Sequence, residues 1–368
     1  YTRRLFAELG VLGKLEAAGF VRKHGAQFHL GNGSKGTKFV FARGAFTREP
    51  EAWQVERARF DDLLLRHAAT LGVEVREGWT ATRFRMAGGA VEVDAEAGTG
   101  ERATFRAAFL IDATGRANLT GNQEGLREIH PRLRKLAVFG HFRGVRLDAG
   151  PEGGDTVIVR LENKWFWLIP LGAEKTSVGC VLDRDEFAAA KEPPEAVFWR
   201  LVGASPVMRE RMAQAQAVSP VHVTSDFSYK NRRLASPRLL RVGDAAGFMD
   251  PIFSAGVYLA MHSGKLAAET VHAALAAGDD GGARPAGYER RVTRAMRFYW
   301  RMVENYYSRP FMELFLQPAQ RGNLPAAVNA VLAGELEGSW AMRWRLQVFF
   351  WLVRLQTRFP IVPRLEIS

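Results

Sequence analysis

The chain has 368 residues, of which 47% are apolar, 11% aromatic and 24% charged. This composition excludes a disordered or fibrous protein, and the length is enough for two domains of roughly 150 residues each. The formal net charge is +12, so the surface should attract anionic partners. Residues 290–368 hold twelve arginines and five glutamates, which places most of that excess in the last part of the chain.

The single cysteine, Cys180, excludes an internal disulfide framework and argues against a cysteine-based metal site. We therefore expect no metal, and a reducing cytoplasm is the natural compartment. The longest candidate for a membrane span, residues 346–353, is much shorter than the ~20 residues that a span requires. No transmembrane segment is therefore expected, and no signal peptide is visible either.

Apolar residues at helical spacing over residues 3–20, interrupted by glycines, predict two short helices. Residues 26–30 and 37–42 alternate like strands and predict a hairpin with its turn at 31–36. That turn contains Gly31-x-Gly33-x-x-Gly36, the spacing of a dinucleotide-binding fingerprint. The fingerprint must open a helix, whereas a strand follows here, so a hairpin turn is the better interpretation.

Residues 60–71 predict a helix ended by Gly72, followed by a meander of strands at 73–75, 84–86, 90–95 and 103–109. A buried strand is predicted at 109–111. Strands near 138–145, 156–161, 165–170 and 176–182 indicate an antiparallel sheet. Another buried strand at 239–242 precedes a helix over 256–277 and a loop at 276–282. From residue 290 onward the pattern is helical and aromatic, and most of these aromatic side chains are expected in a core.

The stretch from Arg241 to Val257 is the most informative part of the sequence. A buried strand runs into Gly243-Asp244, then into a turn at Asp250-Pro251, and a helix begins near Gly256. Asp244 can accept hydrogen bonds from ribose or ribityl hydroxyls, and the free amides of a helix start attract an anion. The alternative is a strand-to-helix turn that binds nothing.

Gly243-Asp244-Ala-Ala before a helix resembles the flavin-contacting turn of the flavoprotein monooxygenase superfamily. Asp112-Ala-Thr-Gly115-Arg resembles the second chain crossing near the FAD pyrophosphate, where a glycine permits close backbone approach. Gln54-x-x-Arg57 before a helix resembles the segment whose arginine reaches the FAD phosphates, although a solvated arginine is the ordinary alternative. The resemblance implies the following cofactor-binding residues: Gln54, Arg57, Ala113, Gly115, Asp244, Pro251, Gly256 and Val257.

Two tryptophans stand two residues apart in Trp165-x-Trp167-x-Ile-Pro170, so they point to one face of a strand that the proline is expected to end. Two core tryptophans would satisfy the same physics. The pattern nevertheless resembles the signature of flavin-dependent halogenases, and that resemblance implies that Trp165 and Trp167 shield the flavin.

Lys23-x-Gly-Ala-x-Phe28 resembles the segment that carries the catalytic amine in halogenases that do not act on tryptophan, which implies a catalytic role for Lys23. A lysine before a strand is otherwise usually a solvated charge. The halogenases that act on tryptophan have a glutamate three residues before the glycine of the helix-start turn, whereas Phe253 stands here. The sequence therefore resembles the phenol or pyrrole group, whose substrates are often tethered to a carrier protein. The resemblance places the halide at the amides of Ala255 and Gly256.

The resemblance implies an α/β (α+β) fold with an FAD-binding Rossmann-like domain of the flavoprotein monooxygenase type. That domain would comprise residues 1–22, 51–117 and 236–289, interleaved with an antiparallel-sheet substrate domain at 23–50 and 118–235. Residues 290–368 would form a C-terminal helical region. The family's Gly-x-Gly-x-x-Gly fingerprint is missing from this chain, so a βαβ unit of about 40 to 50 residues is expected upstream of Tyr1.

The function implied is that of an FADH2-dependent halogenase, an oxidoreductase that uses O2 and chloride or bromide. Hypohalous acid would reach Lys23, which either hydrogen-bonds it or, as a neutral amine, captures the halogen for an electron-rich aromatic substrate. A flavin reductase would supply FADH2, and the setting would be natural-product or antibiotic biosynthesis. The basic C-terminal surface would dock an acidic carrier protein.

Two other classes remain open. A flavin-dependent hydroxylase or reductase of the same superfamily would share the turns at 112–115 and 243–244, but would not be expected to carry both Lys23 and the paired tryptophans. A non-catalytic basic protein could use the arginine-rich helices to bind nucleic acid or a membrane surface. The halogenase interpretation predicts no nucleic-acid partner.

Overall fold

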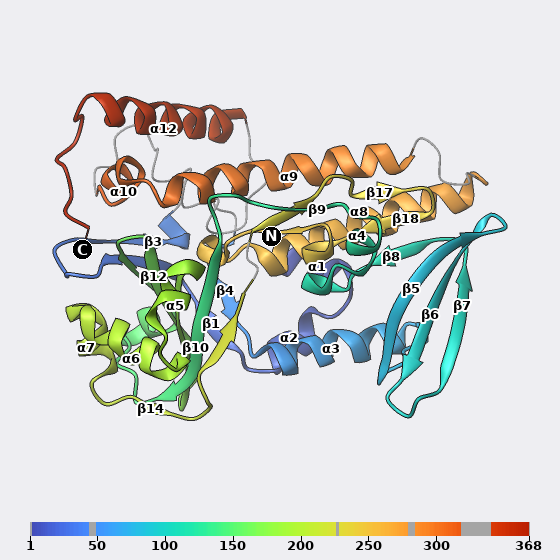
Figure 1. Ribbon diagram of the computed structural model, residues 1–368, viewed down its shortest axis with the longest axis horizontal. Helices are drawn as coiled ribbons and strands as arrows, with labels where there is room; N and C mark the ends of the chain where they lie inside the picture. Colours follow the sequence, from blue (N-terminus) through green and yellow to red (C-terminus); the bar gives the residue numbers. More distant parts are fainter. Residues whose placement is uncertain (1, 44–48, 226–227, 279–283, 318–339, 368) are drawn as a thin grey trace. The chain divides into compact units, whose positions relative to one another are not determined.

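The structure is a computed structural model that describes residues 2–43, 49–225, 228–278, 284–317 and 340–367 (Figure 1). The chain forms two compact units. Unit 1 comprises residues 1–64, 134–226 and 304–368, and unit 2 comprises residues 65–133 and 227–303. The predicted division into a flavin domain, a substrate domain and a C-terminal region has other boundaries and stays a prediction.

Unit 1 is built on a sheet with the order β14-β10-β13-β12-β11-β2-β3, and β15 pairs with β10 beside β14. The neighbours are antiparallel except β2 and β11, which run parallel. The strands are β2 (Gly25–Leu30), β3 (Gly36–Val40), β10 (Lys135–Arg143), β11 (Thr156–Leu161), β12 (Lys164–Gly172), β13 (Lys175–Asp183), β14 (Gln216–Ala217) and β15 (His222–Thr224). The hairpin of β2 and β3 confirms the predicted turn, which spans residues 31–35 because Gly36 already belongs to β3.

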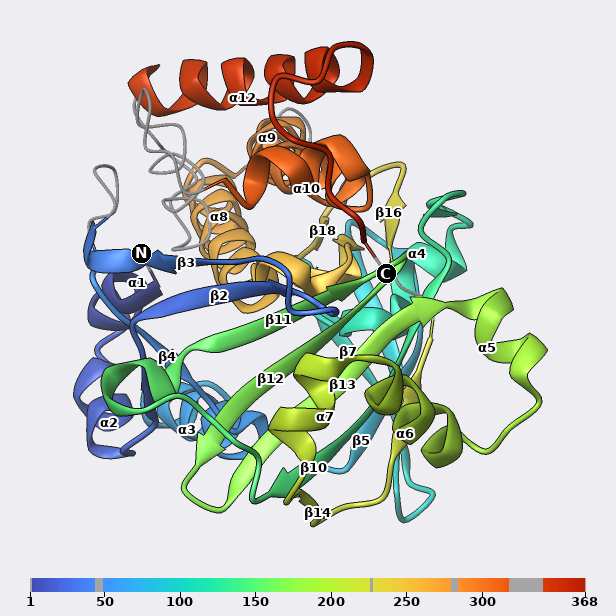
Figure 2. The ribbon, with the colours of Figure 1, turned by 90° about the vertical axis from the view of Figure 1, so that its left-hand side faces the viewer.

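One face of this sheet carries the main core of unit 1. The helices α6 (Pro194–Ala204) and α7 (Pro206–Met212) lie across it, after α5 (Arg184–Ala190) (Figure 2). Alternate strand residues such as Val138, Phe166 and Cys180 pack beneath these helices. The Phe142 and Phe198 rings stack with centroids 5.2 Å apart. Residues at odd positions of β10, β12 and β13 therefore belong to the opposite face.

The rest of unit 1 is helical, apart from the paired strands β1 (Val21–Lys23) and β4 (Ala52–Gln54). The helices are α1 (Thr2–Glu8), α2 (Leu12–Ala17), the first part of α3 (Arg57–Thr70), the end of α9 (Arg284–Tyr306), α10 (Arg309–Phe315) and α12 (Trp340–Arg358). The Phe311 and Phe349 rings join α10 to α12 at 5.4 Å. Fully buried Glu313 accepts hydrogen bonds from Gln356 and from the Leu365 amide, which holds the chain end against α10.

Unit 2 contains the meander β5 (Trp79–Ala87), β6 (Ala90–Ala97) and β7 (Arg102–Ala107). A second small sheet has the order β17-β18-β8, in which β8 (Leu110–Asp112) runs parallel to β18 (Leu239–Arg241) and β17 is Ala235–Ser236. A third joins β19 (Gly247–Phe248), β16 (Tyr229–Asn231) and β9 (Arg127–Ile129). The helices include α4 (Leu119–Gln123), α8 (Gly256–Ala276) and most of α9.

Four sequence predictions need correction. Residues 73–75 form no strand, because they follow α3 as an exposed segment without a strand partner, and Val73 is 56% exposed. Strand β8 is only partly buried, since it lies at the edge of its sheet and Ile111 is 39% exposed. Pro170 does not end its strand: β12 continues to Gly172, and the pairing shifts register after the proline, as a bulge permits.

The fourth correction concerns the aromatic residues after position 290, most of which were expected to be buried. The buried ones include Tyr299, Tyr306, Phe311, Phe315, Phe349 and Phe350. Trp340, Trp351 and Phe359 are more than half exposed, and Trp344 is 38% exposed. Helix α12 thus buries one face and displays tryptophan on the other, which the helical period permits but composition does not reveal.

Within the described ranges, no helix is long and apolar enough to cross a membrane. Tyr1 and most of the predicted loop at 276–282 lie outside the described residues.

Candidate active site

Lys23 is the last residue of β1 and is only 7% exposed. Its Nζ lies 5.7 Å from the centroid of the Phe41 ring. Burial lowers the pKa of Lys23 from 10.5 to about 8, and the Asp155 carboxylate partly opposes that shift. The amine therefore exchanges between its neutral and charged forms close to neutral pH, which is unusual for a lysine.

The Asp155 carboxylate is 1% exposed and is held beside β1 by the backbone. Its Oδ1 accepts a hydrogen bond from the His24 amide at 3.2 Å, and its Oδ2 lies 3.6 Å from Lys38 Nζ. A Cβ at Gly25 would overlap the Phe39 carbonyl oxygen and come within 3.2 Å of Asp155 Oδ2. The glycine of the Lys-x-Gly-Ala-x-Phe segment is thus required for packing around the lysine. Sequence reasoning missed Asp155, because it belongs to no recognised motif.

Gln54 ends β4 and is also buried. Its Nε2 donates to the Gly154 carbonyl oxygen at 3.2 Å and to Thr156 Oγ1 at 2.8 Å. Both amide hydrogens are therefore used inside unit 1, beside the Asp155 segment. Arg57, the first residue of α3, has a side chain 65% exposed and forms an ion pair with Asp61 at 2.8 Å. Contacts of Gln54 and Arg57 with flavin stay predictions.

Trp165 and Trp167 point to the face of β12 opposite α6 and α7, as their spacing predicts, and their ring centroids are 5.9 Å apart. Each indole N–H has a hydroxyl acceptor: Trp165 donates to Tyr307 at 2.9 Å and Trp167 to Ser177 at 3.1 Å. Gly179 is the partner of Trp167 on β13, where a Cβ would overlap the indole ring. The rings are therefore fixed in orientation. Their shielding of a flavin stays a prediction.

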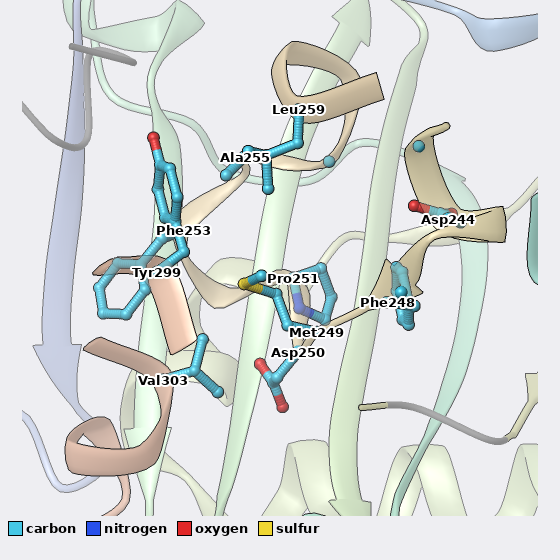
Figure 3. A pocket seen from close by; sticks show the side chains of 13 residues that line it. Asp244, Phe248, Met249, Asp250, Pro251, Phe253, Ala255, Leu259, Tyr299 and Val303 are labelled. Atoms are coloured by element: carbon cyan, nitrogen blue, oxygen red, sulfur yellow. The ribbon is translucent and has the colours of Figure 1, made fainter. Parts of the chain in front are cut away.

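Unit 2 holds a small pocket where β18 leads into α8. It is enclosed by the turn after β18, the segment before α8, and α9 (Figure 3). Asp244 and Phe248 lie on one side of it, and Phe253 and Tyr299 on the other (Figure 3). The lining residues are Gly243, Asp244, Gly247, Phe248, Met249, Asp250, Pro251, Phe253, Ala255, Gly256, Leu259, Tyr299 and Val303.

The start of α8 is open on the pocket side. Ser254 has φ of +53°, and Ala255 precedes the helix without a side-chain cap. The first intrahelical bond runs from the Leu259 amide to the Ala255 carbonyl oxygen at 2.9 Å, so the amides before it lack helical acceptors. A Cβ at Gly256 would meet nothing within 4 Å. Val257 follows, partly exposed.

Asp250 is 2% exposed and fixes the approach to this helix. Its Oδ1 accepts from the Ile252 amide and its own amide donates to Ser228 Oγ, both at 3.1 Å. The short turn Pro251–Phe253 is therefore anchored from both sides. Asp250 is also a residue that sequence reasoning did not assign to the site, although its place before a proline at a helix start is typical of a cap.

The structure brings the segments at 112–115 and 243–245 together. They follow the adjacent parallel strands β8 and β18, and the Val242 amide donates to the Asp112 carbonyl oxygen at 2.9 Å. Burial acts to raise the pKa of Asp112, but hydrogen bonds from Thr120 and Thr114 outweigh it and leave the pKa lowered. Gly115 adopts φ of +62°, which favours glycine, and Ala113 is exposed.

No cluster of three or more His, Cys, Asp or Glu side chains that could hold a metal is found in the described part of the chain. The site residues thus form two groups. Lys23, Gln54, Arg57, Trp165 and Trp167 belong to unit 1. The turns at 112–115 and 243–244 and the helix start at 251–257 belong to unit 2.

Comparison with known proteins identifies the fold and the family of the chain. The solved structure of the flavin-dependent brominase Bmp2 matches with a TM-score of 0.83 and 26% identity, covering 96% of this chain and 87% of that one. The predicted α/β fold of the flavoprotein type is thereby confirmed. The sequence profile of the tryptophan halogenase family matches residues 33–332. The chain therefore belongs to this family of flavin-dependent halogenases, as the sequence resemblance predicted.

Two curated relatives illustrate the range of the family. The tryptophan 2-halogenase of Chondromyces crocatus is 32% identical over 307 residues, covering 82% of this chain and 56% of that protein. A 1H-pyrrole-2-carbonyl-(peptidyl-carrier protein) brominase of Pseudoalteromonas luteoviolacea (strain 2ta16) is 31% identical over 280 residues, covering 75% of this chain and 67% of the relative. The chain thus spans little more than half the length of the first of these proteins.

Proposed function

We propose that this chain halogenates an electron-rich aromatic substrate, using reduced FAD, O2 and chloride or bromide. The observation that carries the proposal is Lys23, a lysine 7% exposed whose pKa burial lowers to about 8. A structural lysine gains nothing from such burial, because removing its charge from water costs free energy. A lysine that must be neutral part of the time needs that environment.

The residues of unit 2 fit a flavin. A ring system can approach the start of α8 closely, because Gly256 has no side chain and no atom of the described residues lies within 4 Å of where a Cβ would be. Asp244 would hold ribityl hydroxyls, Ala113 and Gly115 would lie near the pyrophosphate, and Pro251 and Val257 would border the ring. When reduced FAD is bound, it would activate O2, and the activated oxygen would oxidise halide to hypohalous acid.

The chain's own residues then have three tasks. The amides of Ala255 and Gly256, with the positive end of the α8 dipole, would hold the halide. Trp165 and Trp167 would form a wall that excludes water, since both rings are fixed by hydrogen bonds. Lys23 would handle the hypohalous acid near the substrate.

Lys23 can do so in two ways. As an ammonium it donates a hydrogen bond to the hypohalous acid and polarises the oxygen–halogen bond. As a neutral amine it attacks the halogen: the nitrogen–halogen bond forms, the oxygen–halogen bond breaks, and hydroxide leaves with the amine proton as water. A pKa of about 8 keeps both forms accessible. The aromatic ring then takes the halogen and loses a ring proton.

We also propose a specific form of the substrate and a protein partner. The relative from Pseudoalteromonas is named for a carrier-bound pyrrole acyl group, and a tethered substrate is proposed here by analogy. Arg290, Arg294 and Arg297 are exposed on α9 at helical spacing, as an acidic carrier protein would need. A separate flavin reductase would supply the reduced flavin.

The test is direct. The protein is supplied with reduced FAD, chloride and a phenol, and the product is examined for the mass gained when chlorine replaces hydrogen. Lys23→Ala should keep flavin binding and lose the chlorinated product. A hydroxylated product from the native protein would instead support the hydroxylase alternative, and chlorination by Lys23→Ala at the native rate would remove the lysine from the mechanism.

A further inference from the structure

The face of the unit 1 sheet opposite α6 and α7 carries a group of aromatic and imidazole side chains, of which only Trp167 has a role in the proposed function. Residues opposite each other in antiparallel strands share a face. Phe139 on β10 pairs with Gly179 on β13, which pairs with Trp167 on β12. His141 pairs with Ser177, and His222 on β15 pairs with Phe139. Five side chains therefore gather here: Phe139, His141, Trp167, Ser177 and His222.

Ring contacts confirm this arrangement. The Phe139 centroid is 6.1 Å from that of Trp167 and 5.6 Å from that of His222. Gly179 leaves room for this approach, because a Cβ there would overlap both Trp167 and Phe139. Phe139, His141 and Trp167 are each half-buried. The face thus offers flat apolar surfaces with polar groups beside them, as a site for an aromatic ligand requires.

His141 is the polar group with a defined orientation. Its Nδ1 lies 3.4 Å from Ser219 Oγ, and its backbone amide donates to the same oxygen at 3.0 Å. Ser219 can donate its one hydroxyl hydrogen to the Pro220 carbonyl oxygen at 3.3 Å. In that arrangement His141 Nδ1–H donates to Ser219 Oγ, and Nε2 carries a lone pair that can accept a proton.

The charges around His141 suit that use. Burial lowers the pKa of His141 below 6.5, the Lys175 ammonium lowers it further, and Glu56 partly opposes both. His222 also lowers the pKa when it is charged. Lys175 forms an ion pair with Glu56, and hydrogen bonding to this lysine lowers the pKa of the Glu56 carboxyl. The imidazole is therefore neutral at pH 7, and the Lys175 ammonium that acts on it is itself paired with Glu56.

We propose that His141 accepts the hydroxyl proton of a phenolic substrate whose ring lies against Phe139 and Trp167. This inference rests on the proposed halogenase function and names its substrate class. The oxygen–hydrogen bond of the phenol breaks, its electron pair stays on oxygen, and a nitrogen–hydrogen bond forms at His141 Nε2. The resulting phenolate is a stronger nucleophile toward an electrophilic halogen. A pyrrole N–H is too weak an acid for an imidazole to deprotonate, so the residue favours hydroxylated rings.

The first experiment needs neither halide nor turnover. A nitrophenol whose hydroxyl titrates near neutral pH is added to the protein with and without FAD, and the phenolate absorption band is followed against pH. Bound to the native protein, the nitrophenol should ionise about one pH unit below its midpoint in solution. His141→Gln should abolish that shift. His272→Gln, which removes an exposed imidazole on α8, should keep it.

The second experiment compares rates of halogenation over a series of fluorinated phenols of increasing acidity. His141→Gln should slow phenol itself roughly 100-fold or more, the usual contribution of a positioned base. The ratio of native to variant rates should fall toward one for the most acidic phenols, which ionise unaided. The acid limb of the native pH profile should also disappear in the variant.

Several outcomes would overturn the proposal. They are an unchanged nitrophenol midpoint in native protein, a shift that survives in His141→Gln, and a rate ratio equal for all phenols, which would mark a structural role. Thermal unfolding of each variant checks that it is folded, and Ser219→Ala, which frees Nδ1, provides a milder perturbation. If native protein halogenates no phenol, the proposed function fails, while the spectral shift still tests proton acceptance by His141.

Discussion

Lys23 and the start of α8 are two polar sites built by opposite means. Around Lys23 the chain fills space: Phe41 lies beside the amine, and Asp155 and Gln54 are buried, with Asp155 Oδ1 and Gln54 Nε2 hydrogen-bonded. At α8 the chain leaves space, because Gly256 faces an open region and the helix has no side-chain cap. Under the proposed function, the first site would work through a side chain whose pKa the surroundings set, and the second through backbone amides.

This difference determines which property of the protein each site affects. A buried charge costs folding free energy, so the Lys23 site reduces stability whether or not a ligand is present. The α8 site should cost little folding free energy in the free protein. Changes to it should therefore alter ligand affinity rather than stability. Stability and ligand affinity should therefore respond in opposite ways when the two sites are changed.

The largest expected effect is that of Lys23→Met. Halogenation should fall 100-fold or more, because the transfer to substrate needs the amine. The free energy of unfolding at pH 7 should rise, by up to about 3 kcal/mol, since a folded pKa of about 8 against 10.5 unfolded disfavours folding of the charged lysine. Product mass spectrometry and urea unfolding measure the two. Lys230→Met, an exposed lysine, should change neither.

The lowered pKa of Lys23 also sets how the free energy of unfolding depends on pH. Between pH 8 and 10.5 the unfolded chain carries the Lys23 proton and the folded chain does not, so native stability should rise with pH across this window. Lys23→Met should lack that rise. A native stability that falls relative to the variant over the same range would contradict the buried, pKa-lowered amine.

Gly256→Val should leave stability unchanged and weaken ligand binding, in contrast to Lys23→Met. The side chain enters open space, so the melting temperature should stay close to native, while flavin affinity falls about tenfold or more and the halide KM rises. Gly115→Val is the contrasting change, because φ of +62° strains any side chain at a cost of about 1 to 3 kcal/mol. Gly203→Val, in open space on α6, serves as the neutral control. Native flavin affinity and halide KM in Gly256→Val would contradict the ligand's placement.

A smaller shift is expected from Asp155→Asn. The asparagine oxygen can still accept a hydrogen bond from the His24 amide. Asparagine carries no negative charge to raise the pKa of Lys23, so that pKa should fall below about 8. The pH dependence of Lys23 acylation, read by peptide mass spectrometry, reports the change. Glu152→Gln, a nearby exposed carboxylate, should leave the midpoint almost unmoved. An upward shift in Asp155→Asn would mean that the carboxylate does not act on Lys23.

The smallest effects belong to the charged surface of α9. Single reversals Arg290→Glu, Arg294→Glu and Arg297→Glu should each weaken turnover of a carrier-tethered substrate a few-fold at low salt, less at high salt. A free phenol should be unaffected. Arg343→Glu on α12 tests whether the response is specific to α9. Equal native turnover of the free and tethered forms would favour a free substrate.

Strongly periodic segments allowed most elements to be predicted from the sequence. The strands β11 to β13 and the helix α8 lie close to their expected ranges. Residues 73–75 show the limit, since a Val-x-Val pattern becomes a strand only if a partner is available, and partners are set by the rest of the fold. The prediction that the strand ending at Ile111 is buried was wrong for the same reason, because its place at the edge of a sheet depends on the rest of the fold.

The site shows a similar boundary. Lys23 and Asp244 could be proposed as site residues from the sequence because contiguous motifs mark them. Asp155 and His141 could not, because their importance depends on which strands become neighbours. His141 meets Ser177 only through the register of β10 and β13, and Asp155 reaches β1 through a turn whose Gly154 could not carry a side chain beside Arg22. Such contacts join residues far apart in the sequence.

Cys180 lies in the sheet core, fully buried, and burial strongly raises the pKa of its thiol. Thiolates are among the groups that oxidants attack first, and the thiol form deep in a core reacts slowly. Under the proposed function this protein generates a powerful oxidant within itself. Its only cysteine is held in its least reactive form beneath α6 and α7, so the catalyst should lose no activity through oxidation of sulfur at this position.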